Sequence, residues 1–441
     1  MSTINPALRS RLGRRAPAAD VLGPALVACL LPALLVCAGL VAYDGNPTGL
    51  IRFGTDFAAA IHPPRGAVVT RGSGYDGQYF WALAQDPLLL RARTLAAFAD
   101  QTFRLQRVAY PALAWLAAGG GRALIPWTLI AVNVVAIVAA TLAVAAWLRR
   151  RGRCGWWSLG LALQPAFAYA VLADLSDALA VAALVGGLIA YWERRRWTAA
   201  ALLTVAVLAR EPMLLAVAAI GIDLVLGREG TGSLSRAAGG HRLAGGVRRM
   251  PGAVRLGARA GWAGPRARCA SPRAVCVGAV RHAVRRVRVA GRALWPVTVV
   301  PVIAFAGWLA YVDVRLGGAQ SDPGTAFAGP MAGVAAEVRR ALRSAPIDAA
   351  WDLAYLTLML AGILAAALLV ARRRCAASLA ALLFGLTLPW MVFGGALSYT
   401  RLSAPMFACL LLAALARRSR PALALCAAVA SLGPLVALGI G

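Results

Sequence analysis

Lysine is absent from the sequence, so all 46 basic side chains are arginines, and only 17 residues are acidic. We relate the absence of lysine to the codon usage of a GC-rich bacterial genome and draw no function from it. Charged residues make up 14% of the 441 residues and hydrophobic residues 60%, with a mean hydropathy of +0.70. This composition excludes a soluble domain of that length and is typical of an integral membrane protein.

Several common site motifs are also missing. The chain has three histidines and eight cysteines, with no Cys-x-x-Cys pair. We interpret His62, His241 and His282 as solvated and the cysteines as free thiols, so neither a disulfide nor a zinc site is predicted. No Walker or dinucleotide-binding glycine motif occurs, which argues against an ATP-driven pump. A Ser-His-Asp or Cys-His hydrolase is also not expected, because the side chains of such a site do not occur together on one side of the predicted membrane.

The hydrophobic residues form long runs. A helix needs roughly 17 to 25 such residues to cross about 30 Å of hydrocarbon, whereas membrane strands would show alternation. We therefore predict an all-α, polytopic transmembrane bundle of about ten or eleven helices. The predicted helices span residues 21–43, 123–148, 156–172, 174–192, 197–209, 211–227, 293–312, 351–371, 376–396, 402–416 and 421–440.

Arginine clusters separate many of these apolar runs. If residues 1–20 form a cytoplasmic tail, every cluster falls on the cytoplasmic side, as the positive-inside rule expects. We therefore predict a multi-pass protein of the plasma (inner) membrane. The clusters lie in residues 149–153, 194–196, 228–292, 372–374 and 417–420.

Two apolar segments have more than one interpretation. The run 21–43 follows four arginines, but it is longer than a signal-peptide core and lacks a small-residue cleavage site, so we interpret it as a retained helix. Residues 197–227 could form one tilted helix, but a single crossing would place residues 372–374 outside. We therefore favour a hairpin with Arg210 and Glu211 at its outer tip.

Two segments outside the membrane pattern divide the chain. The outer loop 44–107, within the N-terminal membrane region 21–227, has the mixed composition of an ordered loop with short helices. The run 108–118 that follows is too short to span and is predicted to be re-entrant or interfacial. The cytoplasmic segment 228–292 separates this region from the C-terminal membrane region 293–441.

The segment 228–292 is rich in glycine, alanine and arginine, and Glu229 is its only acid. Such a composition fits a flexible linker. It also fits binding to anionic lipid headgroups, with residues 279–294 as a basic amphipathic helix. Nucleic acid is not expected as a partner, because the segment has almost no aromatic side chains for base stacking.

Most acidic residues fall on the predicted outer side, and part of this asymmetry follows from the positive-inside rule. Arg210 with Glu211, and Tyr399 with Arg401, also reach the outer membrane boundary. Charges close to hydrocarbon are costly and tend to pair or to serve a site, so a polar pocket is predicted there. Arg210 and Glu211 alone would equally fit a pair that caps a helix turn.

The most distinctive string is Gly-Tyr-Asp-Gly-Gln-Tyr-Phe-Trp at 74–81. Glycines on both sides of Asp76 allow a tight turn and leave its carboxylate accessible. The neighbouring aromatic rings, including Tyr75 and Tyr79, could hold a sugar ring or anchor the loop at the lipid headgroups. Arg107 begins the Arg-Val-Ala-Tyr-Pro segment, which leads towards the membrane.

This arrangement resembles a known family. A long first outer loop with an aspartate in a Tyr-Asp-Gly setting, followed by an aromatic-Pro segment, is similar to the GT-C class of membrane glycosyltransferases, which use polyprenyl-phosphate sugars. The resemblance is strongest to bacterial relatives of the mannosyltransferases that build lipid-linked glycans. Residues 399–405 resemble their late arginine and proline element, and residues 210–212 resemble their basic outer turn. Such enzymes often carry an Asp-Glu or Trp-Asp pair where this chain has residues 75–77, which leaves the sugar open.

The resemblance implies inverting transfer of a sugar from a polyprenyl-phosphate donor to a glycan, lipid or protein acceptor outside the membrane. Asp76 would be the catalytic general base, and Arg210 and Arg401 would bind the leaving phosphate. Asp56 would orient the acceptor or share a divalent metal ion, the one cofactor left open. The candidate substrate-binding residues are Asp56, Tyr75, Gln78, Tyr79, Arg107, Arg210, Glu211, Tyr399 and Arg401.

Two other classes remain open. A secondary transporter would have many helices and a basic charge, but its site would lie near the midplane on broken helices, often with repeated halves. Here Asn133 and Gln164 are the main polar residues within helices, and the first outer loop of about sixty residues is long for a carrier. The third possibility is a non-catalytic membrane protein of cell-envelope glycan assembly.

Overall fold

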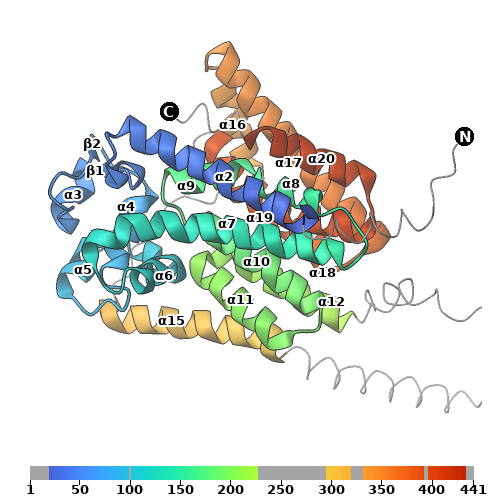
Figure 1. Cartoon of the computed structure of the whole chain (residues 1–441), viewed down its shortest axis with the longest axis horizontal. Helices are drawn as coiled ribbons and strands as arrows, with labels where there is room; N and C mark the ends of the chain where they lie inside the picture. The colour runs from blue at the N-terminus through green and yellow to red at the C-terminus, as the bar shows by residue number, and fades with distance from the viewer. Residues whose placement is uncertain (1–18, 99–100, 227–294, 319–330, 392–395, 434–441) are drawn as a thin grey trace, which may run out of the picture.

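The computed structural model of the chain describes residues 19–98, 101–226, 295–318, 331–391 and 396–433. This part of the chain is an all-α helical bundle (Figure 1), as predicted. Its one small sheet pairs two parallel strands of two residues each, β1 and β2, which sequence analysis did not predict. The strands are Phe53–Gly54 and Val69–Thr70.

Five helical segments in the described residues are long and apolar enough to cross a membrane, and four shorter apolar helices accompany them. The apolar runs in the sequence account for both groups. The total of ten or eleven crossings stays a prediction. The long helices are α2 (Ala19–Ala42), α7 (Ile125–Arg149), α15 (Val300–Leu316), α17 (Pro346–Arg373) and α19 (Ala396–Arg417), and the shorter ones are α10 (Asp177–Trp192), α11 (Arg196–Ala209), α18 (Ala376–Thr387) and α20 (Arg420–Ser431). The π-helical turn η6 (Trp295–Val299) leads into α15.

The predicted single helix 156–172 is wrong in detail, because it is broken in the middle. Proline lacks a backbone N–H and disfavours helical geometry in the residue before it. Gln164, which precedes Pro165, is accordingly extended, with φ −65° and ψ 133°. The segment therefore consists of η4 (Gly155–Ser158), α8 (Leu159–Ala162) and α9 (Pro165–Leu172).

The predicted helix 376–396 also ends early. α18 stops at Thr387 and continues as the 3-10 turn η7 (Leu388–Trp390), after which Met391 is extended. Pro389 in this turn has no N–H to continue the α-helical ladder. The last predicted helix, 421–440, is described only as far as residue 433.

The segment 197–227 contains two helices, as predicted. α11 ends at Ala209, Arg210 is extended, and the turn η5 (Glu211–Met213) leads into α12 (Leu214–Val225). α12 packs mainly against α18, whereas α11 packs mainly against α10. The two arms of the predicted hairpin therefore lie in different parts of the bundle.

The described residues of the loop 44–107 form short helices, as predicted. The short helix α6 (Ala109–Ala117) packs against α4 and α7. The short helices of this region lie at one end of the long helices (Figure 1). The elements of this region are η1 (Pro47–Leu50), α3 (Thr55–Ile61), α4 (Asp76–Ala84), α5 (Ala92–Ala97), η2 (Thr102–Gln106), α6 and η3 (Arg122–Leu124). A further short helix, α16 (Ala332–Ala341), packs against α17 and η7.

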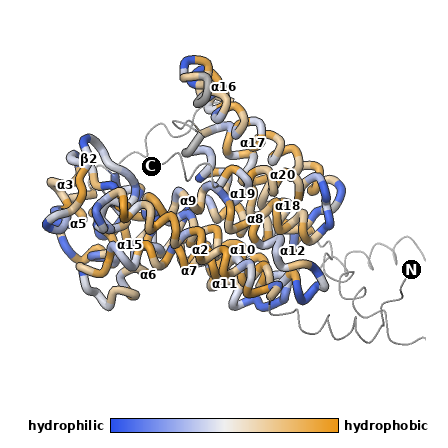
Figure 2. Tube along the Cα trace, turned by 45° about the horizontal axis from the view of Figure 1, so that its top comes forward, coloured by the Kyte–Doolittle hydropathy of each residue, from blue (hydrophilic) through white to orange (hydrophobic). Residues whose placement is uncertain are grey.

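Arginine clusters from distant parts of the sequence meet at the other end of the bundle. Arg149 pairs with Asp20 at 2.6 Å, and Arg417 donates to the carbonyl oxygen of Arg374 at 2.7 Å. Hydrophobic residues dominate the helices between the two more hydrophilic ends (Figure 2). Residues 1–18 of the predicted tail 1–20 lie outside the described residues, and so does the basic segment 228–292 with its proposed amphipathic helix.

Candidate functional site

Asp76 is the first residue of α4, and the backbone around it is tightly constrained. Gly74 has φ +66°, a conformation that favours glycine. A β-carbon on Gly77 would lie 2.6 Å from the carbonyl oxygen of Ile51 and 2.7 Å from that of Ala173. The glycines on both sides of Asp76 therefore permit the turn and the close packing that bring its carboxylate into the bundle.

Gln78 supports this turn from the inside. Its side chain is fully buried; Oε1 accepts a hydrogen bond from Gly54 N at 2.9 Å, and Nε2 donates to Ser73 O at 2.6 Å. Its amide oxygen and nitrogen thus both bind the backbone of the loop. The structure gives Gln78 a role in positioning the loop that carries Asp76.

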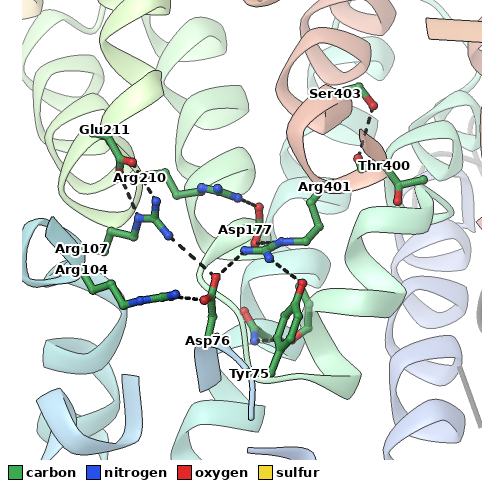
Figure 3. A network of polar contacts seen from close by, with 12 residues as sticks. Tyr75, Asp76, Arg104, Arg107, Asp177, Arg210, Glu211, Thr400, Arg401 and Ser403 are labelled. Atoms are coloured by element: carbon green, nitrogen blue, oxygen red, sulfur yellow. Dashed lines mark hydrogen bonds and ion pairs between the residues drawn. The ribbon is translucent and has the colours of Figure 1, made fainter. Parts of the chain in front are cut away.

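Three guanidinium groups converge on the Asp76 carboxylate (Figure 3). Arg401 Nη2 donates to Oδ2 at 3.0 Å, Arg107 Nη1 lies 3.9 Å from Oδ2, and Arg104 is ion-paired with Oδ1. Burial raises the pKa of Asp76, but the three arginines together lower it well below its usual range. Asp76 is therefore ionised at neutral pH.

Two further carboxylates, Asp177 and Glu211, bind two of these three arginines and a fourth arginine, Arg210. Asp177, the first residue of α10, accepts from Arg401 Nε at 3.2 Å and is ion-paired with Arg210 (Figure 3). Glu211 accepts two hydrogen bonds from Arg107, at 2.8 Å from Nη2 and 3.0 Å from Nε. Such paired bonds fix the plane of a guanidinium as well as its position.

The cluster carries one net positive charge, because four arginines face three carboxylates. Burial, with the neighbouring cations Arg107 and Arg401, lowers the pKa of Arg210 to about 9, so it remains protonated at neutral pH. Burial raises the pKa of Glu211, but pairing with Arg107 outweighs this effect and lowers it to about 2. The net positive charge of the cluster favours the binding of an anion.

The cluster faces a cavity of about 760 Å³ with one charged wall and otherwise largely apolar walls. The charged wall comes from the start of α4, the loop before α6, the turn after α11 and the first part of α19. Helices α12 and α15 and the α18–η7 region supply apolar groups. The charged residues are Asp76, Arg104, Arg107, Arg210, Glu211 and Arg401, and the apolar ones include Phe103, Leu214, Leu215, Phe305, Met391 and Leu402.

Helix α15 holds the segment that carries Arg104 and Arg107. The indole N–H of Trp308 donates to the carbonyl oxygen of Leu105 at 2.9 Å, across 203 positions of sequence. The guanidinium of Arg104 also lies over the ring of Tyr79, 4.1 Å from its centroid. The C-terminal half of the chain therefore helps to place the cations of the first loop.

Six of the predicted site residues line this one cavity: Tyr75, Asp76, Arg107, Arg210, Glu211 and Arg401. The other four are placed differently. Asp56 is exposed on α3, Gln78 is buried behind the loop, and Tyr79 packs against Phe57 and Arg104. Tyr399 is buried, and its hydroxyl donates to Met391 O at 3.1 Å.

Arg104 and Asp177 were missed as site residues by sequence reasoning. Arg104 precedes the predicted site residue Arg107 by three positions. These two arginines are the only charged residues of the sequence between positions 101 and 121. Asp177 stands at the joint of two apolar helices, where an acid close to hydrocarbon is itself a signal. The signals were present, but nothing in the sequence connected these residues to Asp76.

The cluster does not fit a divalent cation, because its three carboxylates already face four guanidinium groups. Among the described residues, no group of three or more His, Cys, Asp and Glu side chains converges to hold a metal ion. No family model, curated protein or solved structure matches the chain.

Proposed function

We propose that this protein is an integral membrane glycosyltransferase that moves a sugar from a polyprenyl-phosphate donor to an acceptor on the outer side of the membrane. The observation that supports this most is the pairing of a net-positive arginine cluster with apolar walls in one cavity. A lipid phosphate needs both: cations for the headgroup and hydrocarbon contacts for the chain. The site lies at the helix ends that are opposite the arginine clusters. The positive-inside rule would place the clusters in the cytoplasm and therefore the site on the outer side of the plasma membrane.

In the proposed reaction, an acceptor hydroxyl oxygen attacks the anomeric carbon of the donor sugar. The bond between that carbon and the phosphate oxygen breaks, and the anomeric configuration inverts. The carboxylate of Asp76 takes the hydroxyl proton, and the polyprenyl phosphate leaves with the bonding electrons. Arg210 and Arg401 stabilise the negative charge on the leaving phosphate.

The arginines around Asp76 bear on its role as a base. While three guanidinium groups surround the carboxylate, its lowered pKa makes it a weak proton acceptor. A donor phosphate that binds Arg401 would compete for the N–H group that Asp76 now accepts from and would add negative charge nearby. Both effects raise the pKa of Asp76, so the base would gain strength when the donor is bound.

The acceptor would be a glycan, lipid or protein, and membrane lipids would surround the bundle.

A secondary transporter is the rival assignment. Its site would lie near the midplane of the membrane, whereas this cavity lies among helix ends at one side of the bundle. The geometry therefore favours transfer at the membrane boundary.

Transfer of a labelled sugar from a short-chain polyprenyl-phosphate donor, by purified protein in lipid nanodiscs, tests this function. We expect transfer by the wild-type protein and inverted configuration in the product. Absence of transfer across a panel of hexosyl and pentosyl donors and lipid, glycan and peptide acceptors would contradict the proposal. A positive uptake assay in proteoliposomes would instead favour the transporter.

A further inference from the structure

Asp177 holds two of the four arginines, although it is not among the residues that line the cavity. Its side chain is 2% exposed, compared with 8% for Arg210 and 11% for Arg401. Each oxygen of Asp177 serves a different arginine. One of these arginines follows α11, and the other belongs to α19.

We infer that Asp177 is the positioning residue that aims Arg210 and Arg401 at a phosphate group in the cavity. This inference rests on the proposed function for the identity of the anion. Arg401 uses Nε to bind Asp177, so its two Nη groups face Tyr75 at 2.8 Å and Asp76 at 3.0 Å. Both of these partners line the cavity.

The physical reason is pre-organisation. An arginine side chain has many rotamers, and ordering it at the moment of binding would weaken the affinity for the anion. A buried carboxylate shared by two guanidinium groups orders both before the ligand arrives. It also offsets the repulsion between them, which would otherwise drive the two cations apart.

The position of Asp177 at the start of α10 suits this role. An acid in the first turn of a helix is stabilised by the helix dipole, so the carboxylate has support besides the arginines. Asp174 provides a contrast; it lies three residues before α10, in the turn that joins α9 to α10. Asp174 is fully buried, and neither of its carboxylate oxygens has a hydrogen-bond partner among the residues that the structure describes.

The test compares Asp177→Asn with Asp174→Asn as a matched control. The same chemical change is made three positions apart, but only one of the two residues holds arginines. The probe is farnesyl monophosphate, titrated against full-length protein in nanodiscs, and the melting temperature of each variant is recorded. We expect at least tenfold weaker binding by Asp177→Asn and less than a twofold change in Asp174→Asn.

A second variant covers the case in which Asp177→Asn does not fold. Asp177→Glu keeps the charge but moves the carboxylate by one methylene, so we expect a folded protein that binds the probe at least threefold more weakly. Wild-type affinity in a folded Asp177→Asn, or in Asp177→Glu if only that variant folds, would overturn the positioning role. Binding by wild type without sugar transfer from any donor would reject the proposed enzyme but leave this role intact, whereas no binding of the phosphate probe by wild type would overturn both.

Discussion

Arg401 and Asp76 are 325 positions apart in the sequence, yet Arg401 Nη2 donates to Asp76 Oδ2 at 3.0 Å. Asp76 begins α4 in the loop 44–107, whereas Arg401 lies near the start of α19. This contact joins the first and last thirds of the chain at the cavity. The proposed base, Asp76, and a proposed phosphate-binding residue, Arg401, thus hold each other in place.

The first prediction concerns the base. Asp76→Asn removes the proton acceptor, so we expect sugar transfer to fall by about 10²- to 10⁴-fold, the usual contribution of a general base. Initial rates with a labelled donor provide the measurement. Asp44→Asn is the matched control, because Asp44 is exposed and its positive φ suits asparagine. Transfer at the wild-type rate by Asp76→Asn would rule out this base.

The second prediction concerns Arg104, which pairs with Asp76 and lies over the ring of Tyr79. We expect Arg104→Gln to lower kcat/KM for the donor by about 10- to 100-fold, because one preorganised cation is lost. Arg104→Lys should recover little, since a lysine cannot reproduce the planar guanidinium. Arg65→Gln removes an exposed arginine and serves as the control. Full activity of the lysine variant would show that only charge matters there.

The third prediction concerns the effect of pH on stability. The pKa of Glu211 falls from 4.5 to about 2 in the folded protein. A carboxyl group with a lowered pKa stabilises the fold fully above its unfolded value, and this stabilisation is lost as the pH falls towards the folded value. We therefore expect the melting temperature to drop between about pH 4.5 and pH 2. The drop should be smaller in Glu211→Gln, and equal slopes in both proteins would contradict this account.

The fourth prediction concerns Gly77. An added β-carbon would lie within 2.7 Å of two backbone carbonyl oxygens, which cannot easily move. We expect Gly77→Ala to lower the free energy of unfolding by about 1–3 kcal/mol, as overpacking does, and to lower activity as well. Gly307→Ala adds the same atom to α15, where no atom of the described residues lies within 4 Å. Equal melting temperatures of the two variants would contradict the close packing around α4.

The fifth prediction concerns orientation. In a protein with its other cysteines replaced, the exposed Cys154 beside an arginine cluster should react with a membrane-impermeant maleimide only after the cells are permeabilised. Asp44→Cys in a cysteine-free protein should react in intact cells. The reverse pattern would place the cavity on the cytoplasmic side and exclude an extracytoplasmic acceptor.

Parts of the fold were predictable because they depend on local composition. Runs of apolar residues specified the long helices, and the break at Arg210 was expected from the distribution of arginines. The breaks at Pro165 and Pro389 were missed, although proline is a local signal, because the apolar runs continue across them. The site was predicted in part, because six candidates meet in one cavity. Tyr399 does not line this cavity but donates a hydrogen bond to Met391, which does, and Asp56 is exposed to solvent.

By itself, the sequence determined that the chain is an apolar helical protein, that its arginines gather at particular helix ends, and that Asp76 stands in a glycine-flanked turn. Only the tertiary structure decided that Arg104 and Asp177 join the cluster and that Gln78 serves the loop rather than the cavity. The physical reason is that hydrophobicity and turn chemistry act over a few neighbouring residues. The meeting of side chains hundreds of positions apart depends on how each helix is rotated and shifted against its neighbours, which no local pattern encodes.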